Sequence, residues 1–470
     1  MTIRLRVVLA FSAAWAAVSP AGAQQAGWRA GAAKVDITPD AASLAPGDII
    51  RDPLFVRAIV IGGDEACAVL AGADLGGLTE QVARQAIADV SAVTGCPQEN
   101  IILSATHTHS AAGSARLRAG PGAGLGDAIV KAVTMAKAAM KPATIGYGTT
   151  QVDLNINRDL FSGNRWMQGP NPDGPSDKTL AVLEVLGKDG LPIGVYLNYA
   201  IHPINFYMSG VVSGDVPGEA SRYIERRYGP AMVAIFAQGA AGDQNPKLTR
   251  PQNKLARIRT GVAGAADMRV IVPATASAGD ESESMARRMA ALASTVPEER
   301  KAEYLAAVEE VGEVVSASGV LLGESAISLM HRGAMARVGS GPIKAATRTL
   351  QCPGRDRMDR ENPVREGALP PYADGALVTI RAGMLRIGDI YISSIDGEVY
   401  SDIASRLKQA APVSRLMMTS LANGAANSGY IYSDQASGNL TFQVIGSRLH
   451  PGCAENAIVT SALEMIGTLR

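Results

Sequence analysis

Apolar runs of two different periods alternate along this chain of 470 residues. Two runs typical of strands, "LFVRAIVIG" and "CAVLAGADL", precede a helical pattern, "TEQVARQAIADVSAVTG", which Gly95 ends. The next run, "NIILSATHTH", is again typical of a strand, and similar runs follow at "LAVLEVL", "IGVYLNYAIHP" and "MVAIFAQGAAG". This alternation predicts an α/β fold with a mixed β-sheet core covered by helices. Polar loops at the strand ends are then the expected place of a functional site.

The domain organisation follows from the same pattern. Hydrophobic residues make up 47% of the chain and charged residues 19%, as is ordinary for a folded globular protein. Between Glu281 and Val311, charged and apolar residues recur at helical spacing, which is typical of an inserted surface pair of helices. We therefore expect a single domain over residues 24–470, with a small helical insertion at about 277–325.

The charge balance bears on the partners. Forty-four Lys and Arg residues face 44 Asp and Glu residues, so the chain has no net charge. Nothing in this balance attracts the chain to nucleic acid or to an anionic membrane. A small-molecule substrate fits better, whereas the oligomeric state is not indicated by the sequence.

The N-terminus has the pattern of an export signal. Arg4 and Arg6 precede an apolar stretch from about Val7 to Val18, and the small residues Ala21-Gly22-Ala23 form a cleavage site. The apolar stretch is shorter than the ~20 residues that a membrane span needs. We therefore expect residues 1–23 to be a cleaved signal peptide and the mature chain to be periplasmic or secreted in a bacterium, without stable membrane insertion.

Four cysteines accompany this export signal: Cys67, Cys96, Cys352 and Cys453. An oxidising compartment favours disulfides, and four cysteines allow three pairings, between which the sequence does not choose. Buried free thiols remain an alternative. Because the chain contains no CxxC spacing, a cysteine metal site is not expected.

Histidines are scarce, and two of the five lie two residues apart, at His107 and His109. On a strand, residues i and i+2 project from the same face, so the two rings would project together from the strand's end. Small residues follow them and leave room at their side. His202 ends another apolar run, and if the two strands are neighbours the three histidines converge.

Zinc suits such a cluster, because neutral imidazoles bind it well and a carboxylate can complete the ligand set. Two carboxylates end apolar runs and are candidates, Glu398 in "SSIDGEVYSDIASRLK" and Asp243 in "QGAAGDQNP". An alternative for Glu398 is a structural role in the first turn of a helix, where the helix dipole favours an acidic side chain.

Six short motifs occur in an order that resembles the neutral (non-lysosomal) ceramidase family. They are "LSATHTHS", "LNINRD", "NYAIHPINF", "FAQGAAGDQNP", "IDGEVYSDIASRLK" and "NSGYIY". The resemblance extends from "AAKVDITPD" to the C-terminus. It implies a catalytic domain of that fold and a zinc site whose ligands would be His107, His202, Glu398 and Tyr430. Tyr432 is the alternative for the tyrosine ligand.

The resemblance also implies roles for residues around the metal. His109 would be an acid/base residue beside the zinc, since an imidazole can transfer protons near neutral pH. Arg158 would contact the substrate or an oxyanion, and a structural salt bridge is its alternative. Asp243 and Asn245, in the stretch "GDQNPK", are further catalytic candidates, and a turn-stabilising role is the alternative for Asn245.

The sequence departs from the family pattern in two places. The amidases of the family carry a serine nucleophile in a G-D-x-S-P-N motif, and here Asn245 stands in the serine's place. A neutral amide is a poor nucleophile, so we expect attack by a metal-activated water instead of an acyl-enzyme. We also expect the chain to lack the C-terminal immunoglobulin-like domain.

Together, these observations predict an exported zinc-dependent amidohydrolase that cleaves a linear amide, possible substrates including N-acyl lipids. Three alternatives remain open. These alternatives are a true ceramidase with an unrecognised nucleophile, an esterase, and a metal-containing binding protein without catalytic activity.

Overall fold

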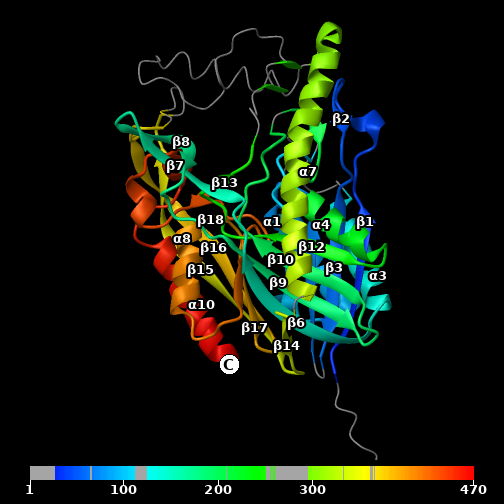
Figure 1. Ribbon diagram of the computed structural model, residues 1–470. Coiled ribbons are helices and arrows are strands. Elements are labelled where there is room, and N and C mark those ends of the chain that lie inside the picture. The colour runs from blue at the N-terminus through cyan, green and yellow to red at the C-terminus, as the bar shows by residue number, and fades with distance from the viewer. Residues whose placement is uncertain are drawn as a thin grey trace, which may run out of the picture.

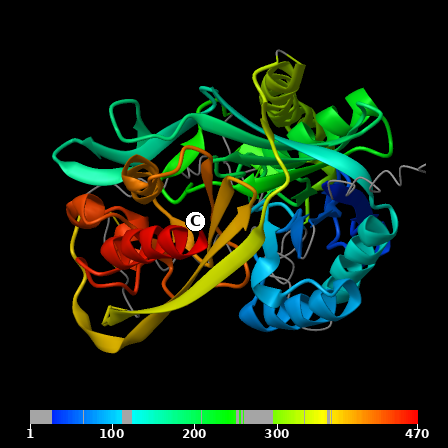
Figure 2. The same ribbon diagram turned by 90° about the horizontal axis from the view of Figure 1, so that it is seen from below.

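The computed structural model describes residues 27–63, 66–111, 124–207, 209–249, 254–255, 258–259, 295–331, 333–359, 364 and 366–470. Within them, two β-sheets pack together and helices cover their outer faces (Figures 1 and 2). This architecture confirms the α/β class with a mixed sheet core and helices. The predicted signal peptide, residues 1–23, and residues 277–294 of the predicted insertion lie outside the described residues.

The larger sheet has nine strands in the order β12-β10-β9-β6-β1-β3-β4-β5, with β14 paired to β6. The pairs β10/β12 and β4/β5 are parallel, and the other pairs are antiparallel. The strands are β1 (Arg29–Asp36), β3 (Phe55–Gly62), β4 (Cys67–Ala73), β5 (Ile101–Ala105), β6 (Lys141–Gln151), β9 (Thr179–Gly187), β10 (Pro192–Tyr199), β12 (Val233–Gln238) and β14 (Ala336–Val338).

The second sheet has four strands in the order β15-β16-β17-β19. These strands are β15 (Ile343–Arg357), β16 (Tyr372–Ile387), β17 (Ile390–Ile395) and β19 (Leu416–Thr419). Three small sheets connect the layers. Their strands are β2 (Ile49–Ile50), β11 (Val211–Val212), β7 (Asn155–Ser162), β8 (Arg165–Asn171), β13 (Gln244–Pro246), β18 (Glu398–Val399) and β20 (Tyr430–Ile431).

The two large sheets pack face to face. Alternate side chains of one strand show this packing, because they belong to different buried clusters. On β3, Ile59 and Ile61 lie in the same buried cluster as Ile390 and Ile392 of β17, between the sheets. The intervening Val60 faces the opposite way, into a cluster lined by helices. Because successive side chains of a strand point to opposite faces, both faces of the larger sheet are buried. The molecule is therefore a sandwich of helices, two sheets and helices.

Helices form the two outer layers. α1 and α3 cover one part of the larger sheet, α4 and α7 cover another part, and α8 and α10 cover the second sheet. The helices are α1 (Glu80–Thr94), α3 (Leu125–Ala138), α4 (Asp215–Tyr228), α7 (Lys301–His331), α8 (Ser401–Ala410), α9 (Phe442–Gly446) and α10 (Ala454–Leu469).

The predicted helix after the second strand run is confirmed as α1. Thr79 caps its first turn, where the side-chain oxygen accepts a hydrogen bond from the amide of Val82. Gly95 ends the helix with a φ of 76°, a left-handed conformation that glycine adopts without steric cost. Sequence signals at both ends therefore fix this element.

The described part of the predicted insertion is one continuous helix. α7 runs for 31 residues along α4 and stands out as the long helix in Figure 1. Its residues Val311, Val315 and Leu322 share a buried cluster with Ala220 and Ile224 of α4. One face of α7 therefore belongs to the main hydrophobic core, while its other face, with Leu305 and Leu321, is exposed.

A close approach between strands brings distant chain segments together. β1 and β6 pair over only two residues. β12 also comes close to β4, and a Cβ atom placed on Gly72 would lie 2.8 Å from Cγ2 of Ile235. Only a residue without a side chain permits this contact. The segments that follow β5 and β10, which carry the histidines, also come near one another: the backbone amide of His109 donates to the carbonyl oxygen of Pro203.

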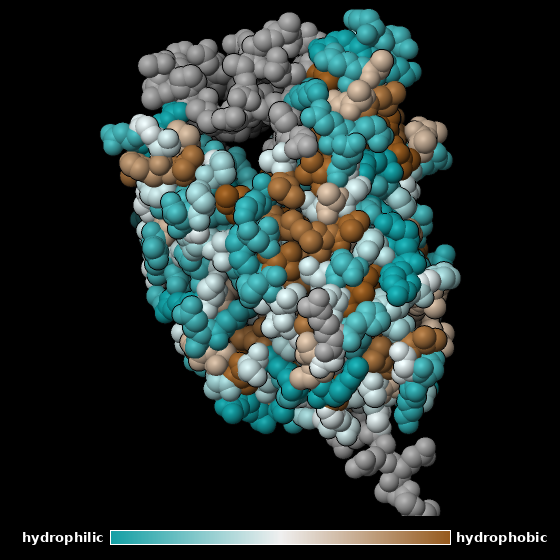
Figure 3. Space-filling view, viewed as in Figure 1, coloured by the Kyte–Doolittle hydropathy of each residue, from teal (hydrophilic) through white to brown (hydrophobic). Residues whose placement is uncertain are grey.

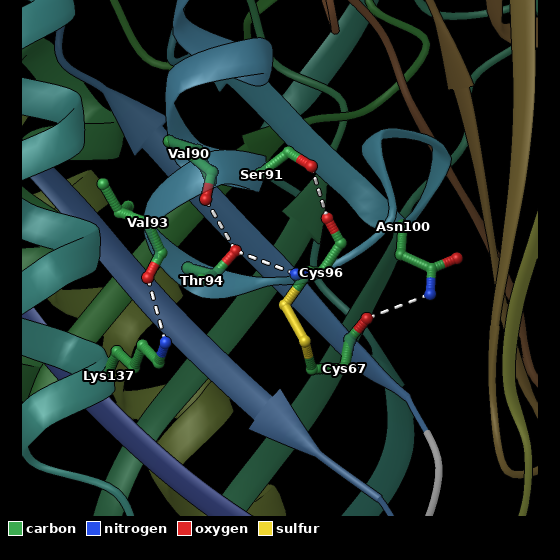
Figure 4. The surroundings of a disulfide bond; sticks show 8 residues. All are labelled: Cys67, Val90, Ser91, Val93, Thr94, Cys96, Asn100 and Lys137. Atoms are coloured by element: carbon green, nitrogen blue, oxygen red, sulfur yellow. Dashed lines mark hydrogen bonds between the residues drawn. A yellow bond between two sulfur atoms is a disulfide. The ribbon is translucent and has the colours of Figure 1, made fainter.

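Two disulfides cross-link the described structure. Cys67 pairs with Cys96 and joins β4 to the end of α1, where Thr94 and Ser91 bind the adjacent backbone (Figure 4). Cys352 pairs with Cys453 and joins β15 to the start of α10. The sequence left the pairing of the four cysteines open, and in the structure each of the two large sheets has one disulfide.

The surface is that of an ordinary globular protein. In the space-filling view the visible face is largely polar, and apolar residues gather near its middle, beside α7 (Figure 3). Among the described residues, no helix combines the length and apolar character that a membrane span requires.

The two disulfides are expected to stabilise the fold unequally. The Cys352–Cys453 bridge closes a chain separation of 101 residues and the Cys67–Cys96 bridge one of 29 residues. A longer loop loses more entropy in the unfolded chain, so removing the first bridge should cost about 1 kcal/mol more than removing the second. Chemical denaturation of the two double-alanine variants measures the difference. Equal losses would contradict this loop-length explanation.

Candidate metal centre

His107 lies just beyond the edge of the larger sheet. β5 ends at Ala105, so neither His107 nor His109 is on a strand, and strand alternation does not explain their common direction. The backbone amide of His107 donates to the carbonyl oxygen of Leu75, and its φ is 68°. Such a left-handed conformation is costly for a residue with a side chain and is often found at functional sites. The turn aims the ring into the molecule.

His202 follows β10 and is held in a similar way. Its backbone amide donates to the carbonyl oxygen of Gln244 over 3.0 Å. Its ring Nδ1 lies 3.1 Å from the carbonyl oxygen of Ala241. Burial lowers the pKa of His202 well below the usual value, and the nearby positive charge of Arg158 lowers it further. The ring is therefore neutral near pH 7.

Three imidazoles and one carboxylate converge. The Nε2 atoms of His107 and His202 are 3.0 Å apart, and Nε2 of His109 lies 3.3 Å from Nε2 of His107. Oε2 of Glu398 lies 3.2 Å from Nε2 of His107 and 3.7 Å from Nε2 of His202. The ring atoms of the three histidines that could bind a metal lie within 4.8 Å of one another.

The hydrogen bonds on the far side of the rings decide what this cluster can bind. Nδ1 of His107 lies 2.6 Å from the carbonyl oxygen of Gly76, and Nδ1 of His202 faces that of Ala241. A carbonyl oxygen only accepts, so each Nδ1 carries a hydrogen and each Nε2 is the ring atom left to bind a ligand. The two Nε2 atoms lie 3.0 Å apart, and a cation bound between their lone pairs would hold both rings. Histidine ligands of metals commonly make this outer hydrogen bond, and the residues present therefore fit a metal ion.

Glu398 and Tyr430 face each other across a two-stranded ladder. β18 and β20 are parallel, and Glu398 is paired in register with Tyr430. Burial raises the pKa of the Glu398 carboxyl, but the histidines and Arg158 outweigh it and bring the pKa to about 2. Burial and the Glu398 charge raise the pKa of the Tyr430 hydroxyl. Tyr432 instead donates to the carbonyl oxygen of Leu449 at 2.6 Å.

Arg158 is buried beside this cluster, on β7. Its Nε and Nη2 donate to the carbonyl oxygen of Gly242 over 3.1 and 2.5 Å. The guanidinium lies 5.3 Å from the ring centres of both Tyr430 and Phe442, within the range of cation–π contacts. Nη1 donates to the side-chain oxygen of Asn245 over 3.2 Å. Arg158 thus makes no carboxylate salt bridge among the described residues.

Asp243 does not lie with the histidines. One carboxylate oxygen accepts the backbone amide of Ser401, the first residue of α8, and the other accepts the Ser401 hydroxyl and the Asn157 side chain. Burial raises the pKa of Asp243 to about 7, although the hydrogen bonds from Ser401 lower it. These contacts make Asp243 a connection between β13, β7 and the start of α8.

Two aromatic residues near the site were missed by sequence reasoning. The exposed ring of Tyr207 lies 5.4 Å from the ring of His109 in an edge-on arrangement. Phe442 packs edge-on against Tyr430, with ring centres 5.6 Å apart. Tyr207 follows the "HP" motif closely and could have been noticed, whereas nothing around Phe442 marks it in the sequence.

Comparisons with known proteins bear on the family and the fold of this chain. Residues 41–341 match the family model described as neutral/alkaline non-lysosomal ceramidase, N-terminal. The neutral ceramidase of Pseudomonas aeruginosa is 29% identical over 277 residues, covering 49% of this chain and 38% of that protein. Neutral ceramidase B of Dictyostelium discoideum is 29% identical over 176 residues, covering 33% of this chain and 24% of that protein.

Solved structures extend the likeness to the whole fold. The crystal structure of neutral ceramidase from Pseudomonas aeruginosa superposes with a TM-score of 0.67 at 18% identity, covering 94% of this chain and 74% of that chain. A structure of a ceramidase complexed with C2 gives a TM-score of 0.66 at 18% identity, covering 95% and 75% of the two chains. The likeness at this identity concerns the fold.

Removal of either buried histidine should empty the centre. We expect His107→Ala and His202→Ala to lose most of the bound metal, because the remaining donors are too few to hold an ion at ordinary concentrations. Metal analysis of the purified proteins measures this. His331→Ala is the matched control, since His331 contacts Tyr228 on the far helices. Full occupancy in both variants would contradict the assignment.

Proposed function

The chain belongs to the neutral/alkaline non-lysosomal ceramidase family, and from this premise we propose that it is a zinc-dependent hydrolase of an amide (N-acyl) bond. The observation that carries the proposal is the opposed pair of Nε2 atoms of His107 and His202, 3.0 Å apart and each backed by a carbonyl oxygen. In a metal-dependent hydrolase, such donors hold the cation that activates the attacking water.

We propose that four residues hold the zinc ion: His107, His202, Glu398 and Tyr430. Glu398 stays ionised because its pKa is about 2, and it offsets part of the ion's charge. When bound, zinc would polarise the scissile carbonyl group and lower the pKa of an attacking water molecule. This set of ligands, two imidazoles, a carboxylate and a phenol, suits zinc better than magnesium or calcium, which prefer oxygen ligands.

His109 is proposed as the acid/base residue. Its Nε2 lies 3.3 Å from that of His107, and its ring is only partly buried. In this position it can accept a proton from the attacking water and give it to the nitrogen of the departing amine. The carboxylate of Asp243 is bound by Ser401 and Asn157, so the proton transfer is assigned to His109.

The substrate is proposed to be a small-molecule linear amide, with N-acyl lipids among the candidates. The matched parts of the two curated relatives, both named neutral ceramidases, span 24% and 38% of those proteins. Their activity is therefore carried to this chain only as a proposal. The two disulfides support a further proposal, that the protein acts in the periplasm or outside the cell.

A hydrolysis screen tests the proposed function. Zinc-loaded and chelator-treated protein would be incubated with N-acyl lipids, N-acyl amino acids, N-acetyl sugars and simple esters, and the products identified by mass spectrometry. We expect amide cleavage by the zinc-loaded protein alone. Activity that survives complete zinc removal would refute the proposed mechanism, and cleavage of esters alone would replace the amide assignment.

The role of His109 can be separated from that of the ligands. His109→Ala should retain zinc but lower kcat by roughly 10²–10⁴-fold, the usual range for a lost general acid/base. Metal analysis and turnover are measured on the same preparation. Metal loss equal to that of His107→Ala would instead make His109 a third imidazole ligand or a required neighbour of one.

A further inference from the structure

The side-chain amide of Asn245 has a fixed orientation. Its Oδ1 accepts a hydrogen bond from Nη1 of Arg158 over 3.2 Å. A guanidinium has only donors, so the amide oxygen must face Arg158, and the NH₂ group must face the opposite way. Among the described residues, no acceptor binds Nδ2 of Asn245. The residue is half-buried, so this donor is open to a ligand.

Arg158 is itself held firmly, which makes the orientation of Asn245 a stable feature. Two donors of the guanidinium bind the carbonyl oxygen of Gly242, and the aromatic rings of Tyr430 and Phe442 flank it. Its side chain is buried. A flip of the Asn245 amide would turn its NH₂ group towards a buried positive charge and leave a donor without an acceptor, which is costly.

Asn245 also lies at the edge of the candidate metal centre. It is on β13, where it pairs with Ile156, and the carbonyl oxygen of its neighbour Gln244 accepts the backbone amide of His202. Arg158, its hydrogen-bond partner, lies 5.3 Å from the ring centre of Tyr430, which is paired in register with Glu398. The free NH₂ group is therefore anchored to the same strand and the same arginine that border His202 and Glu398.

We propose that Nδ2 of Asn245 donates a hydrogen bond to the substrate carbonyl oxygen and to the oxyanion that forms from it, an inference that rests on the proposed amide hydrolysis. As the water oxygen bonds to the carbonyl carbon, the π electrons move onto the carbonyl oxygen. The water proton passes to a base and then to the amine nitrogen as the C–N bond breaks. A donor held in advance stabilises the charge that develops on oxygen.

The chemistry of asparagine fits this role and no covalent one. An amide nitrogen cannot form an acyl-enzyme readily, but its N–H groups are good donors. Because Arg158 takes the amide oxygen, only donors remain for the substrate. The side chain thus selects for a group that accepts hydrogen bonds, and it favours the negatively charged transition state over the neutral substrate.

Asn245→Asp is the decisive variant. The aspartate retains an oxygen for Arg158, now as an ion pair, but presents an acceptor where the wild type presents a donor. If Asn245 only supports Arg158, this variant should be as active as wild type. If it binds the oxyanion, kcat should fall by about 10²–10³-fold or more, the loss typical of one missing donor. Asn164→Asp, at an exposed turn, is the control for added charge.

A binding measurement separates this inference from the proposed reaction. Octylphosphonate has a tetrahedral anionic head that resembles the addition intermediate, and calorimetry gives its Kd without turnover. We expect Asn245→Asp and Asn245→Ala to weaken its binding by ~10²-fold or more, with zinc content and melting temperature near those of wild type. Asn164→Asp should bind as wild type does.

Each outcome decides the question. Weaker phosphonate binding by the Asn245 variants supports the donor role even if no amide substrate is found, in which case only the proposed reaction fails. Unchanged kcat or phosphonate affinity in Asn245→Asp overturns the donor role while leaving amide hydrolysis intact. Failure of the wild-type protein to bind octylphosphonate also overturns it.

Discussion

Two backbone carbonyl groups decide what this site can bind. By accepting from Nδ1 of His107 and His202, the oxygens of Gly76 and Ala241 fix both rings so that their Nε2 atoms oppose each other. Neutral lone pairs held this close repel, and a cation between them converts the repulsion into coordination. The carboxylate of Glu398 brings a negative charge to this cluster, because its Oε2 lies 3.2 Å from Nε2 of His107. The family and the fold supply the frame that holds the carbonyls in place.

The fold was predictable where local signals were strong. Apolar runs identified β3, β4 and β10, and Gly95 marked the end of α1. The division into two sheets was not predictable, because it depends on contacts between strands such as β3 and β17, far apart in the chain. For the same reason the partner of α7 was not predictable: its sequence shows apolar spacing but does not reveal α4, against which its buried face packs.

The candidate site was predictable in its residues more than in its geometry. His107, His202, Glu398 and Tyr430 came from motifs, and they lie together. The reason given for the direction of His107 was wrong, because β5 ends two residues earlier and a left-handed turn aims the ring. Asp243 shows the limit of reasoning from spacing. A carboxylate after an apolar strand can serve a metal or the start of a helix, and only the position of Ser401 distinguishes the two.

The contact between His107 and Glu398 joins residues 291 positions apart in the sequence. Closing so long a loop costs chain entropy, which only the packing of the two sheets offsets. The set of donors is therefore complete only when the two sheets have packed together. During synthesis the two histidine segments emerge long before their carboxylate partner, so an early fragment offers an incomplete set of donors. Tight binding of the ion would therefore indicate that the segments carrying His107 and Glu398 are already in contact.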